Sequence, residues 1–320
     1  MTQAIHLVCD ARVATSPCYL FAMEEAGLTK LGFSKGLDKE HRDYELLTRL
    51  EKAIIHHAKG WERFSVDIPA LLRQSIDEVI DAPRSRRFVI DELEKTEKTY
   101  LGTKVEILLR NHLNLDPGEI LDVRIDGIEV DIKNTIGLNW MIPREVVGRP
   151  CILISTDEKR AKCSFGLVVA ENDTLTRSKN QDGKGNISAE GKKNIHWMLK
   201  DADYPKNFWE GVSKAALKEI TAPKGGTERL ALLFRTYQRV PIYRDVLLAL
   251  AHQKDAMKRL RKNGGARDLL AKDGIALLSG KYNSALIAKL GLPQCGVNDF
   301  LSVKPSMAEE VTMLRGAGLL

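Results

Sequence analysis

Apolar residues recur at helical spacing between residues 45 and 113. From residue 45 to residue 80 they return every three or four positions, which predicts two helices separated near Gly60. Residues 81–83, Asp-Ala-Pro, end the second helix because proline cannot continue it. The same spacing returns over residues 96–113 and predicts a third helix.

The pattern changes to strict alternation over residues 121–133, which read LDVRIDGIEVDIK. Asp126-Gly127 between two alternating runs favours a β-hairpin with a two-residue type I′ turn. Counting outward from this turn pairs Val123 with Val130 and Asp122 with Asp131. Because side chains alternate along a strand, one face is entirely apolar and the other is charged. The charged face contains Asp122, Arg124, Glu129, Asp131 and Lys133.

The remaining pattern predicts a mixed α/β fold in two domains. Two apolar runs, residues 151–155 and 163–170, are typical of buried strands, and the polar, glycine-rich residues 172–190 predict a long loop. Beyond Pro205 the elements are mostly helical. They are expected as helices over residues 207–219, 228–237, 243–251, 255–262 and 266–271, and a strand over 275–278. We therefore expect an N-terminal extension of unknown structure over residues 1–40, a first domain over 41–200 and a second over 205–320.

The composition is that of a soluble globular protein, with 43% hydrophobic and 29% charged residues. No apolar run approaches the roughly 20 residues that a membrane span needs, and the N-terminus lacks the pattern of a signal peptide. The five cysteines are scattered and form no CxxC pair. This favours a reducing, cytoplasmic location over a disulfide framework or a zinc site.

Charge is distributed unevenly over the two expected domains. From Pro205 onward 19 Lys+Arg stand against 10 Asp+Glu, whereas the preceding residues carry 30 against 33. The densest basic stretch is residues 254–267, where six Lys and Arg accompany one Asp. A basic second domain is compatible either with a solvated surface or with a polyanionic partner.

The paired aspartates of the hairpin are the strongest chemical signal. Directly opposed residues have Cβ atoms about 4.5–5.5 Å apart, where two like charges destabilise a sheet. A cation between Asp122 and Asp131 removes that repulsion, and Mg²⁺ binds to one or two carboxylates while keeping several waters. Lys133 follows on the same face and can stabilise charge developing on a phosphate. Glu106, in the helix upstream, is a candidate for a further carboxylate. The alternative is a solvated hairpin face with a chance acid pair.

Several longer stretches resemble the NaeI-type restriction endonucleases. The likeness is dense in EKTEKTYLGTKVEI (94–107), IDGIEVDIK (125–133), WMIP (140–143) and GLVVA (166–170). It resumes in SAEGK (188–192), QKDAMKRLRKNGGAR (253–267) and LGLP (290–293). It covers about residues 40–300, in both expected domains and in the same order.

The resemblance implies an endonuclease domain with a PD-(D/E)xK core over residues 41–200 and a DNA-binding domain with a winged helix-turn-helix over 205–320. Its metal-binding acids match Glu106, Asp122 and Asp131, and its catalytic lysine matches Lys133. Leu121 precedes Asp122, at the position where the motif name PD-(D/E)xK has proline. It further implies Mg²⁺ as cofactor, double-stranded DNA as substrate, stimulation by a second DNA copy, and a companion DNA methyltransferase. A homodimer is expected because a palindromic site and one active site per chain require two-fold symmetry.

With this resemblance, the basic stretch becomes the expected DNA contact of the second domain. A helix over residues 255–262 would direct its cations outward, packed on the apolar helix 243–251. The two glycines that follow would let backbone amides approach a phosphate. The expected DNA-binding residues are Lys258, Arg259, Arg261, Lys262, Gly264, Gly265 and Arg267.

Two other functions are compatible with these features. A DNA repair nuclease with the same catalytic core would recognise DNA structure rather than sequence. A non-catalytic regulator would use only the basic domain, although the complete set of three acids and a lysine argues against it.

Overall fold

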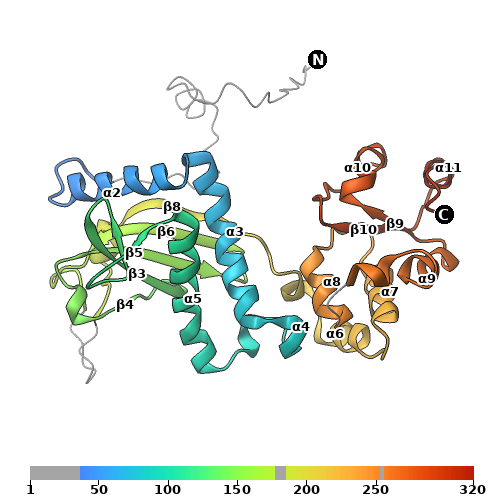
Figure 1. Ribbon diagram of the computed structural model, residues 1–320, viewed down its shortest axis with the longest axis horizontal. Helices are drawn as coiled ribbons and strands as arrows, with labels where there is room; N and C mark the ends of the chain where they lie inside the picture. Colours follow the sequence, from blue (N-terminus) through green and yellow to red (C-terminus); the bar gives the residue numbers. More distant parts are fainter. Residues whose placement is uncertain (1–36, 177–184, 253–255) are drawn as a thin grey trace, which may run out of the picture. The chain divides into compact units, whose positions relative to one another are not determined.

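The computed structural model describes residues 37–176, 185–252 and 256–320 (Figure 1). The chain divides into two compact units. Of the described residues, those up to 72 and those from 102 to 205 form the first unit, and those from 73 to 101 and from 206 to 320 form the second. The expected domain limits remain a prediction. The two units differ from the expected domains in residues 73–101. This segment falls within the expected first domain, but it clusters with the second unit.

The first unit is built on a six-stranded mixed sheet with the strand order β1-β2-β3-β5-β6-β8. Its strands are β1 (Asp116–Pro117), β2 (Val123–Ile125), β3 (Ile128–Ile136), β5 (Pro150–Asp157), β6 (Lys162–Val169) and β8 (His196–Asp203). β3 and β5 run parallel, and the other neighbouring strands are antiparallel. A separate short pair joins β4 (Met141–Ile142) to β7 (Gly185–Asn186). The predicted mixed α/β class is therefore confirmed for this unit.

Both faces of this sheet are covered by apolar side chains. α2 (Tyr44–His57) packs against β2 and β6 (Figure 1). Phe64 on α3 (Trp61–Ile80) meets Phe165 of β6 edge-on, with ring centroids 5.2 Å apart. The opposite face carries Trp140, whose indole Nε1 donates to the Ile154 carbonyl at 2.8 Å. Three further elements are short 3₁₀ helices: η2 (Arg144–Val146), η3 (Gly191–Asn194) and, in the second unit, η4 (Phe208–Gly211). Two apolar layers thus hold the strands that carry the charged hairpin.

The second unit is mainly helical. Its elements after Pro205 include α6 (Lys214–Thr221), α7 (Gly226–Thr236), α8 (Arg244–Ala251), the 3₁₀ helix η5 (Ala256–Leu260) and α9 (Ala266–Lys272). From the earlier segment come α4 (Ala82–Ser85), the 3₁₀ helix η1 (Ile90–Glu92) and the first turns of α5 (Lys95–Leu113). The apolar residues of α6 to α9 and of η5 share one core with Phe88 of the earlier segment, and Leu230, Phe234, Leu247 and Leu250 are fully buried in it.

A two-stranded sheet completes the second unit. β9 (Ala276–Ser279) pairs antiparallel with β10 (Phe300–Val303), and Ile242 bridges to Phe300 on the outer side of β10. Leu277 faces the helical core, whereas Leu278 contributes to a second, smaller cluster. That cluster is covered by α10 (Gly280–Lys289) and α11 (Ala308–Gly316). The β9–β10 pair therefore lies between two apolar layers. In the sequence, α10 lies in the connection between the two strands.

Most predicted elements form, with two differences in the second unit. The helix expected over residues 207–219 is divided into η4 and α6, because the Ser213 side chain caps a new helix by accepting from the Ala216 amide at 3.2 Å. The prediction of a helix over residues 255–262 is wrong. Residues 256–260 form the short 3₁₀ helix η5, and a series of turns follows up to Gly265. The expected extension lies, for residues 1–36, outside the described residues.

Candidate active site

The hairpin of β2 and β3 has the predicted turn and register. Asp126 and Gly127 both have positive φ, 51° and 78°, as a type I′ turn requires. Val123 pairs with Val130 and Ile125 with Ile128. Asp122 lies just before the first paired residue of β2, so its alignment with Asp131 continues the predicted register beyond the paired strands. The short turn thus fixes which side chains share the charged face.

Three residues of that face converge on one ion-pair cluster. The Lys133 ammonium lies 2.6 Å from Asp131 Oδ2 and 3.8 Å from Asp122 Oδ2. The parallel pairing of β3 with β5 places Asp131 beside Cys151 and Lys133 beside Leu153, over the apolar layer of that face. The Asp131 side chain is therefore only 5% exposed, against 25% for Asp122 and 26% for Lys133. The cluster combines a deeply buried acid with two groups that solvent can reach.

The two aspartates have different surroundings. Asp122 Oδ2 accepts a hydrogen bond from the Ile132 amide at 2.7 Å, which ties it to the opposite strand. Asp131 Oδ2 is shielded from solvent and accepts no hydrogen bond, although the Lys133 ammonium is close. Burial raises the pKa of Asp131 to about 6, against the opposing effect of Lys133. A positive charge near this site therefore stabilises a carboxylate that burial disfavours.

Glu106 lies on α5 and belongs to the same electrostatic environment. Its pKa is raised by burial first and then by the negative charge of Asp122, whereas Lys133 lowers it. The structure thus brings Glu106, Asp122, Asp131 and Lys133 together, although they come from a helix and two strands. A carboxyl group whose pKa is raised by burial and by neighbouring carboxylates, as for Glu106 and Asp131, is characteristic of functional sites.

The two aspartates fit a hard divalent cation. Their oxygens are the ligands that Mg²⁺ prefers, and the buried Oδ2 of Asp131 already lies beside a cation, the Lys133 ammonium at 2.6 Å. Within residues 37–176, 185–252 and 256–320, no three His, Cys, Asp or Glu side chains are already arranged as a metal cluster. The Lys133 ammonium, bridging the two carboxylates, is the cation at this position in the structure. Glu106 as a third ligand stays a prediction.

Comparison with known proteins identifies the family. A family sequence model described as "Restriction endonuclease NaeI" matches residues 65–313. The type II restriction enzyme NaeI of Lentzea aerocolonigenes is 32% identical over 232 residues, which cover 70% of this chain and 73% of that enzyme. This chain belongs to the NaeI family of restriction endonucleases. The predicted family and the predicted class of enzyme are confirmed.

The span that matches the NaeI family contains α5, the charged hairpin and the whole basic stretch of the second unit. All four candidate catalytic residues lie within it. Their roles are not established by the match, which concerns the chain as a whole. The geometry described above is the independent support for treating these four residues as one site.

The expected DNA-binding residues do not form one helical surface. Lys258 and Arg259 lie on η5, and Arg261 and Lys262 lie in the turns that follow. Lys262 donates to the Gly318 carbonyl at 2.7 Å, and Arg261 is exposed. The predicted shared face of a regular helix is therefore wrong, because the 3₁₀ helix ends after five residues. Contact of these cations with DNA remains a prediction.

The other three expected DNA contacts have structural partners within the second unit. The Gly264 amide donates to the Asp268 carboxylate at 2.5 Å. A Cβ on Gly265 would collide with the Arg261 carbonyl oxygen, so this glycine allows the turn to close upon itself. The partly buried Arg267 guanidinium donates to the Leu277 carbonyl of β9. Each of these three residues therefore has a structural role within the second unit, which the sequence pattern did not indicate.

Proposed function

We propose that this chain is a type II restriction endonuclease that hydrolyses both strands of a specific double-stranded DNA site in the presence of Mg²⁺. The observation that carries the proposal is the cluster of Asp122, Asp131 and Lys133 on one hairpin face, within a chain of the NaeI family. The relative from Lentzea aerocolonigenes is named a type II restriction enzyme, which supports the same activity.

Each residue of the cluster has a distinct proposed role. Asp122 and Asp131 would hold Mg²⁺, with Glu106 as a further carboxylate. Bound Mg²⁺ supplies Lewis-acid stabilisation of negative charge on the scissile phosphate. The hydrogen bond from the Ile132 amide orients Asp122, and burial against β5 fixes Asp131. These contacts hold the ligands in place before the substrate arrives.

Lys133 would act on the phosphate directly. Its side chain is 26% exposed and lies on the same face as both carboxylates, so its ammonium can reach solvent-accessible substrate. An ammonium held near the attacked phosphate stabilises the developing charge and helps to orient the attacking water. The ion pair with Asp131 holds the Lys133 ammonium in position.

The fold observations support a PD-(D/E)xK core and a winged helix-turn-helix domain. The acids and the lysine lie on a β-hairpin that joins a mixed sheet, with Glu106 on the preceding helix. In the second unit α7, α8 and α9 precede the β9–β10 pair, and Ile242 pairs with β10. Three helices, with the bridging residue Ile242 between α7 and α8 and the β9–β10 pair after α9, are compatible with a winged domain, in which the insertion of α10 between β9 and β10 in sequence would enlarge the wing.

The partners follow from this activity. We propose a cytoplasmic homodimer. Each chain has one proposed catalytic cluster, and a duplex has two strands to cut, so two chains related by two-fold symmetry are needed. A DNA methyltransferase that protects the host's own sites would accompany it, and binding of a second DNA copy to the second unit would stimulate cleavage. Among the described helices, none is long and apolar enough to cross a membrane.

Digestion of a long phage DNA tests this function. The purified protein is incubated with the DNA in MgCl₂ or in EDTA, and the products are resolved on a gel and their ends sequenced. Discrete fragments with one shared end sequence, formed only with Mg²⁺, support the proposal. Cleavage without sequence preference would instead indicate a structure-specific nuclease, and DNA binding without cleavage would indicate a regulator.

A further inference from the structure

Glu129 lies on the charged face of the hairpin, two residues before Asp131 and opposite Arg124 of β2. An acid at this place, on the same face as Asp122, has the chemistry of a further ligand for a hard cation. The ion pair of Arg124, however, is with Glu119, at 3.4 Å. The hydrogen bonds of the Glu129 carboxylate show what this side chain does instead.

The Glu129 carboxylate binds three consecutive backbone amides. Its Oε1 accepts from the Glu119 amide at 3.0 Å, and its Oε2 accepts from the amides of Ile120 and Leu121 at 3.1 and 2.8 Å. Successive N–H groups that converge on one anion form a concave site for it. Both oxygens are thus bound to backbone donors, so Glu129 shapes this loop rather than offering a ligand to a metal ion.

These amides belong to the loop of residues 118–122, which joins β1 to β2 and ends at Asp122. The loop folds tightly at its start, where a Cβ on Gly118 would collide with the Leu121 carbonyl oxygen and with Glu129 Oε2. The Gly118 amide donates to the Asp122 carbonyl at 3.4 Å, and Leu121 is buried in an apolar cluster of the first unit. The loop is thereby fastened from its first residue to its last.

The position of Asp122 depends on this loop. Asp122 lies just before Val123–Ile125, the paired residues of β2, so the loop sets where its backbone lies. Two further contacts act on its side chain, because Oδ2 accepts from the Ile132 amide at 2.7 Å and lies 3.8 Å from the Lys133 ammonium. A displaced backbone would carry Oδ2 away from both partners, and therefore away from Asp131.

We propose that Glu129 is a positioning residue for the metal ion, because it holds the loop that keeps Asp122 beside Asp131. The inference rests on the proposed nuclease function, in which these two aspartates bind Mg²⁺. Glu129 contributes through Asp122 and need not touch the ion or the DNA. Replacing groups that orient metal ligands commonly lowers metal affinity by about 10–100-fold. Loss of Glu129 should therefore weaken cation binding more than it slows the chemical step at saturating metal.

The test uses two variants of Glu129 and one matched control. Glu129→Ala removes the acceptor for all three amides. Glu129→Gln keeps the size and one acceptor oxygen but places an NH₂ group among backbone donors, so it should be partly impaired. This milder variant keeps the test decisive if Glu129→Ala does not fold. The control, Glu119→Ala, removes the side chain that pairs with Arg124 but leaves the Glu119 amide in place as a donor to Glu129.

Three quantities are measured on the full-length protein. The EPR signal of free Mn²⁺ gives the binding of this cation, which accepts the same oxygen ligands as Mg²⁺, in the absence of DNA. Single-turnover cleavage of a duplex bearing the cut sequence gives the rate over a series of Mg²⁺ concentrations, and hydrogen exchange reports on residues 118–122. For Glu129→Ala we expect the Mn²⁺ dissociation constant and the half-saturating Mg²⁺ concentration to rise about tenfold, with faster exchange in the loop. The maximal rate should stay close to that of wild type, and Glu119→Ala should match wild type throughout.

Unchanged Mn²⁺ binding in both Glu129 variants would overturn the positioning role, even if the loop exchanges faster. An equal effect of Glu119→Ala would overturn it too, because it would trace the effect to the ion pair with Arg124. A lower rate at saturating Mg²⁺ with unchanged metal affinity would indicate general damage or a direct catalytic role, and either result contradicts the proposal. If wild type binds no Mn²⁺ without DNA, no cation site is arranged in advance and the proposal fails. If wild type binds Mn²⁺ but does not cut DNA, the proposed function fails, while the Mn²⁺ titrations still decide the role of Glu129.

Discussion

Replacing Asp131 with Asn should stabilise the metal-free protein at pH 8 while abolishing cleavage. Asp131 is 4% exposed, and its pKa in the folded protein is raised to about 6 by burial. In the unfolded chain an aspartate titrates near about 3.9. A raised pKa means that this group favours folding below about pH 3.9 and loses that contribution as the pH rises to about 6. Above pH 6 the folded protein carries the whole penalty of a buried charge.

The magnitude follows from the size of this shift. Two pKa units correspond to about 3 kcal/mol, since each unit is worth about 1.36 kcal/mol. The neutral amide of the variant avoids the buried charge but leaves Lys133 with only Asp122, at 3.8 Å. We therefore expect Asp131→Asn to raise the free energy of unfolding by about 1–3 kcal/mol at pH 8. The difference should disappear near pH 4, where Asp131 of the wild type is protonated.

Urea unfolding followed by tryptophan fluorescence measures this difference. In a Trp209→Phe background, the three remaining tryptophans, Trp61, Trp140 and Trp197, all belong to the first unit. Asp157→Asn is the control of opposite sign, because the pKa of Asp157 is lowered by Arg160 and loss of its charge should destabilise the protein at pH 8. Adding Mg²⁺ should reduce the difference in free energy of unfolding between Asp131→Asn and wild type, because the ion binds to the folded wild type and stabilises it. If Asp131→Asn is less stable than wild type at pH 8, or if the stability difference does not change with pH, the charge of Asp131 does not destabilise the folded protein.

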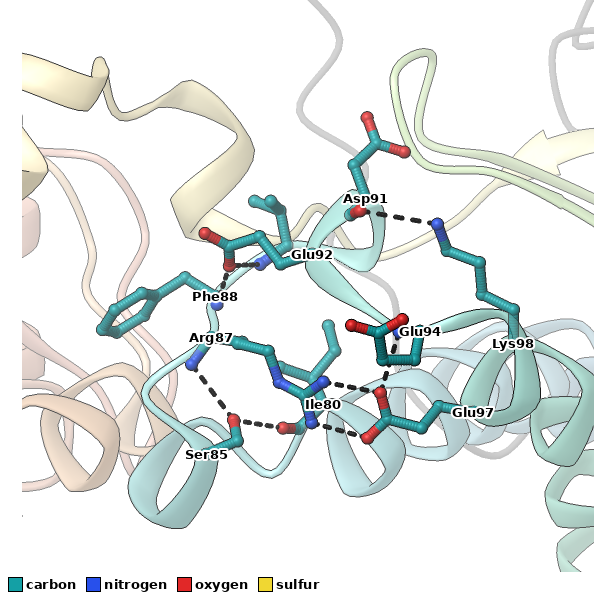
Figure 2. A network of polar contacts seen from close by, with 10 residues as sticks. Ile80, Ser85, Arg87, Phe88, Asp91, Glu92, Glu94, Glu97 and Lys98 are labelled. Atoms are coloured by element: carbon teal, nitrogen blue, oxygen red, sulfur yellow. Dashed lines mark hydrogen bonds and ion pairs between the residues drawn. The ribbon is translucent and has the colours of Figure 1, made fainter.

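Three further predictions concern the second unit. Phe88→Ala should lower its stability by about 3–5 kcal/mol, because the ring is buried against Trp209, and normal hydrogen-exchange protection of α7 in this variant would contradict it. Glu97→Gln should be less stable than wild type at pH 7, and the difference should vanish as the pH falls from about 4.5 toward 2, because the Arg87 guanidinium lowers the pKa of Glu97 to about 2 (Figure 2). A difference that persists at pH 2 in urea unfolding would exclude the charge as its cause. Lys258→Ala should reduce the slope of log binding constant against log salt by about 0.9 in gel shifts with duplex DNA, whereas the exposed control Lys304→Ala should leave it unchanged.

The charged hairpin was predictable because its information is local. The Asp126-Gly127 turn sets the register, and alternation then assigns each side chain to a face, so the grouping of Asp122, Asp131 and Lys133 follows by counting. The surroundings of the two aspartates were not predictable in this way. That Asp131 is buried depends on β5, which lies about twenty residues further along the chain. The hydrogen bond of Asp122 to the Ile132 amide requires a side-chain conformation that no spacing encodes.

The second unit shows where periodicity fails. Residues 255–262 have helical spacing of apolar and basic residues, but turns that pass through Asn263 and Gly264 follow η5, and both of these residues have positive φ. The helix is therefore replaced by a 3₁₀ turn packed through Ala256 and Leu260. Likewise, Phe88 lies in a short, charged segment without periodicity. Its burial arises from contact with Trp209, far along the chain, and no local pattern reveals such a pairing.

Single-turnover cleavage of a duplex bearing the cut sequence tests most directly whether the cluster of Asp122, Asp131 and Lys133 cuts DNA. Wild type, Lys133→Ala and the matched variant Arg124→Ala are compared in Mg²⁺, with DNA binding measured for each in Ca²⁺. Arg124 lies on the same hairpin but pairs with Glu119, at 3.4 Å. We expect Lys133→Ala to lose a factor of about 10²–10³ in cleavage rate with DNA binding preserved, and Arg124→Ala to cut at close to the wild-type rate. A Lys133→Ala variant that cuts at the wild-type rate would contradict this expectation.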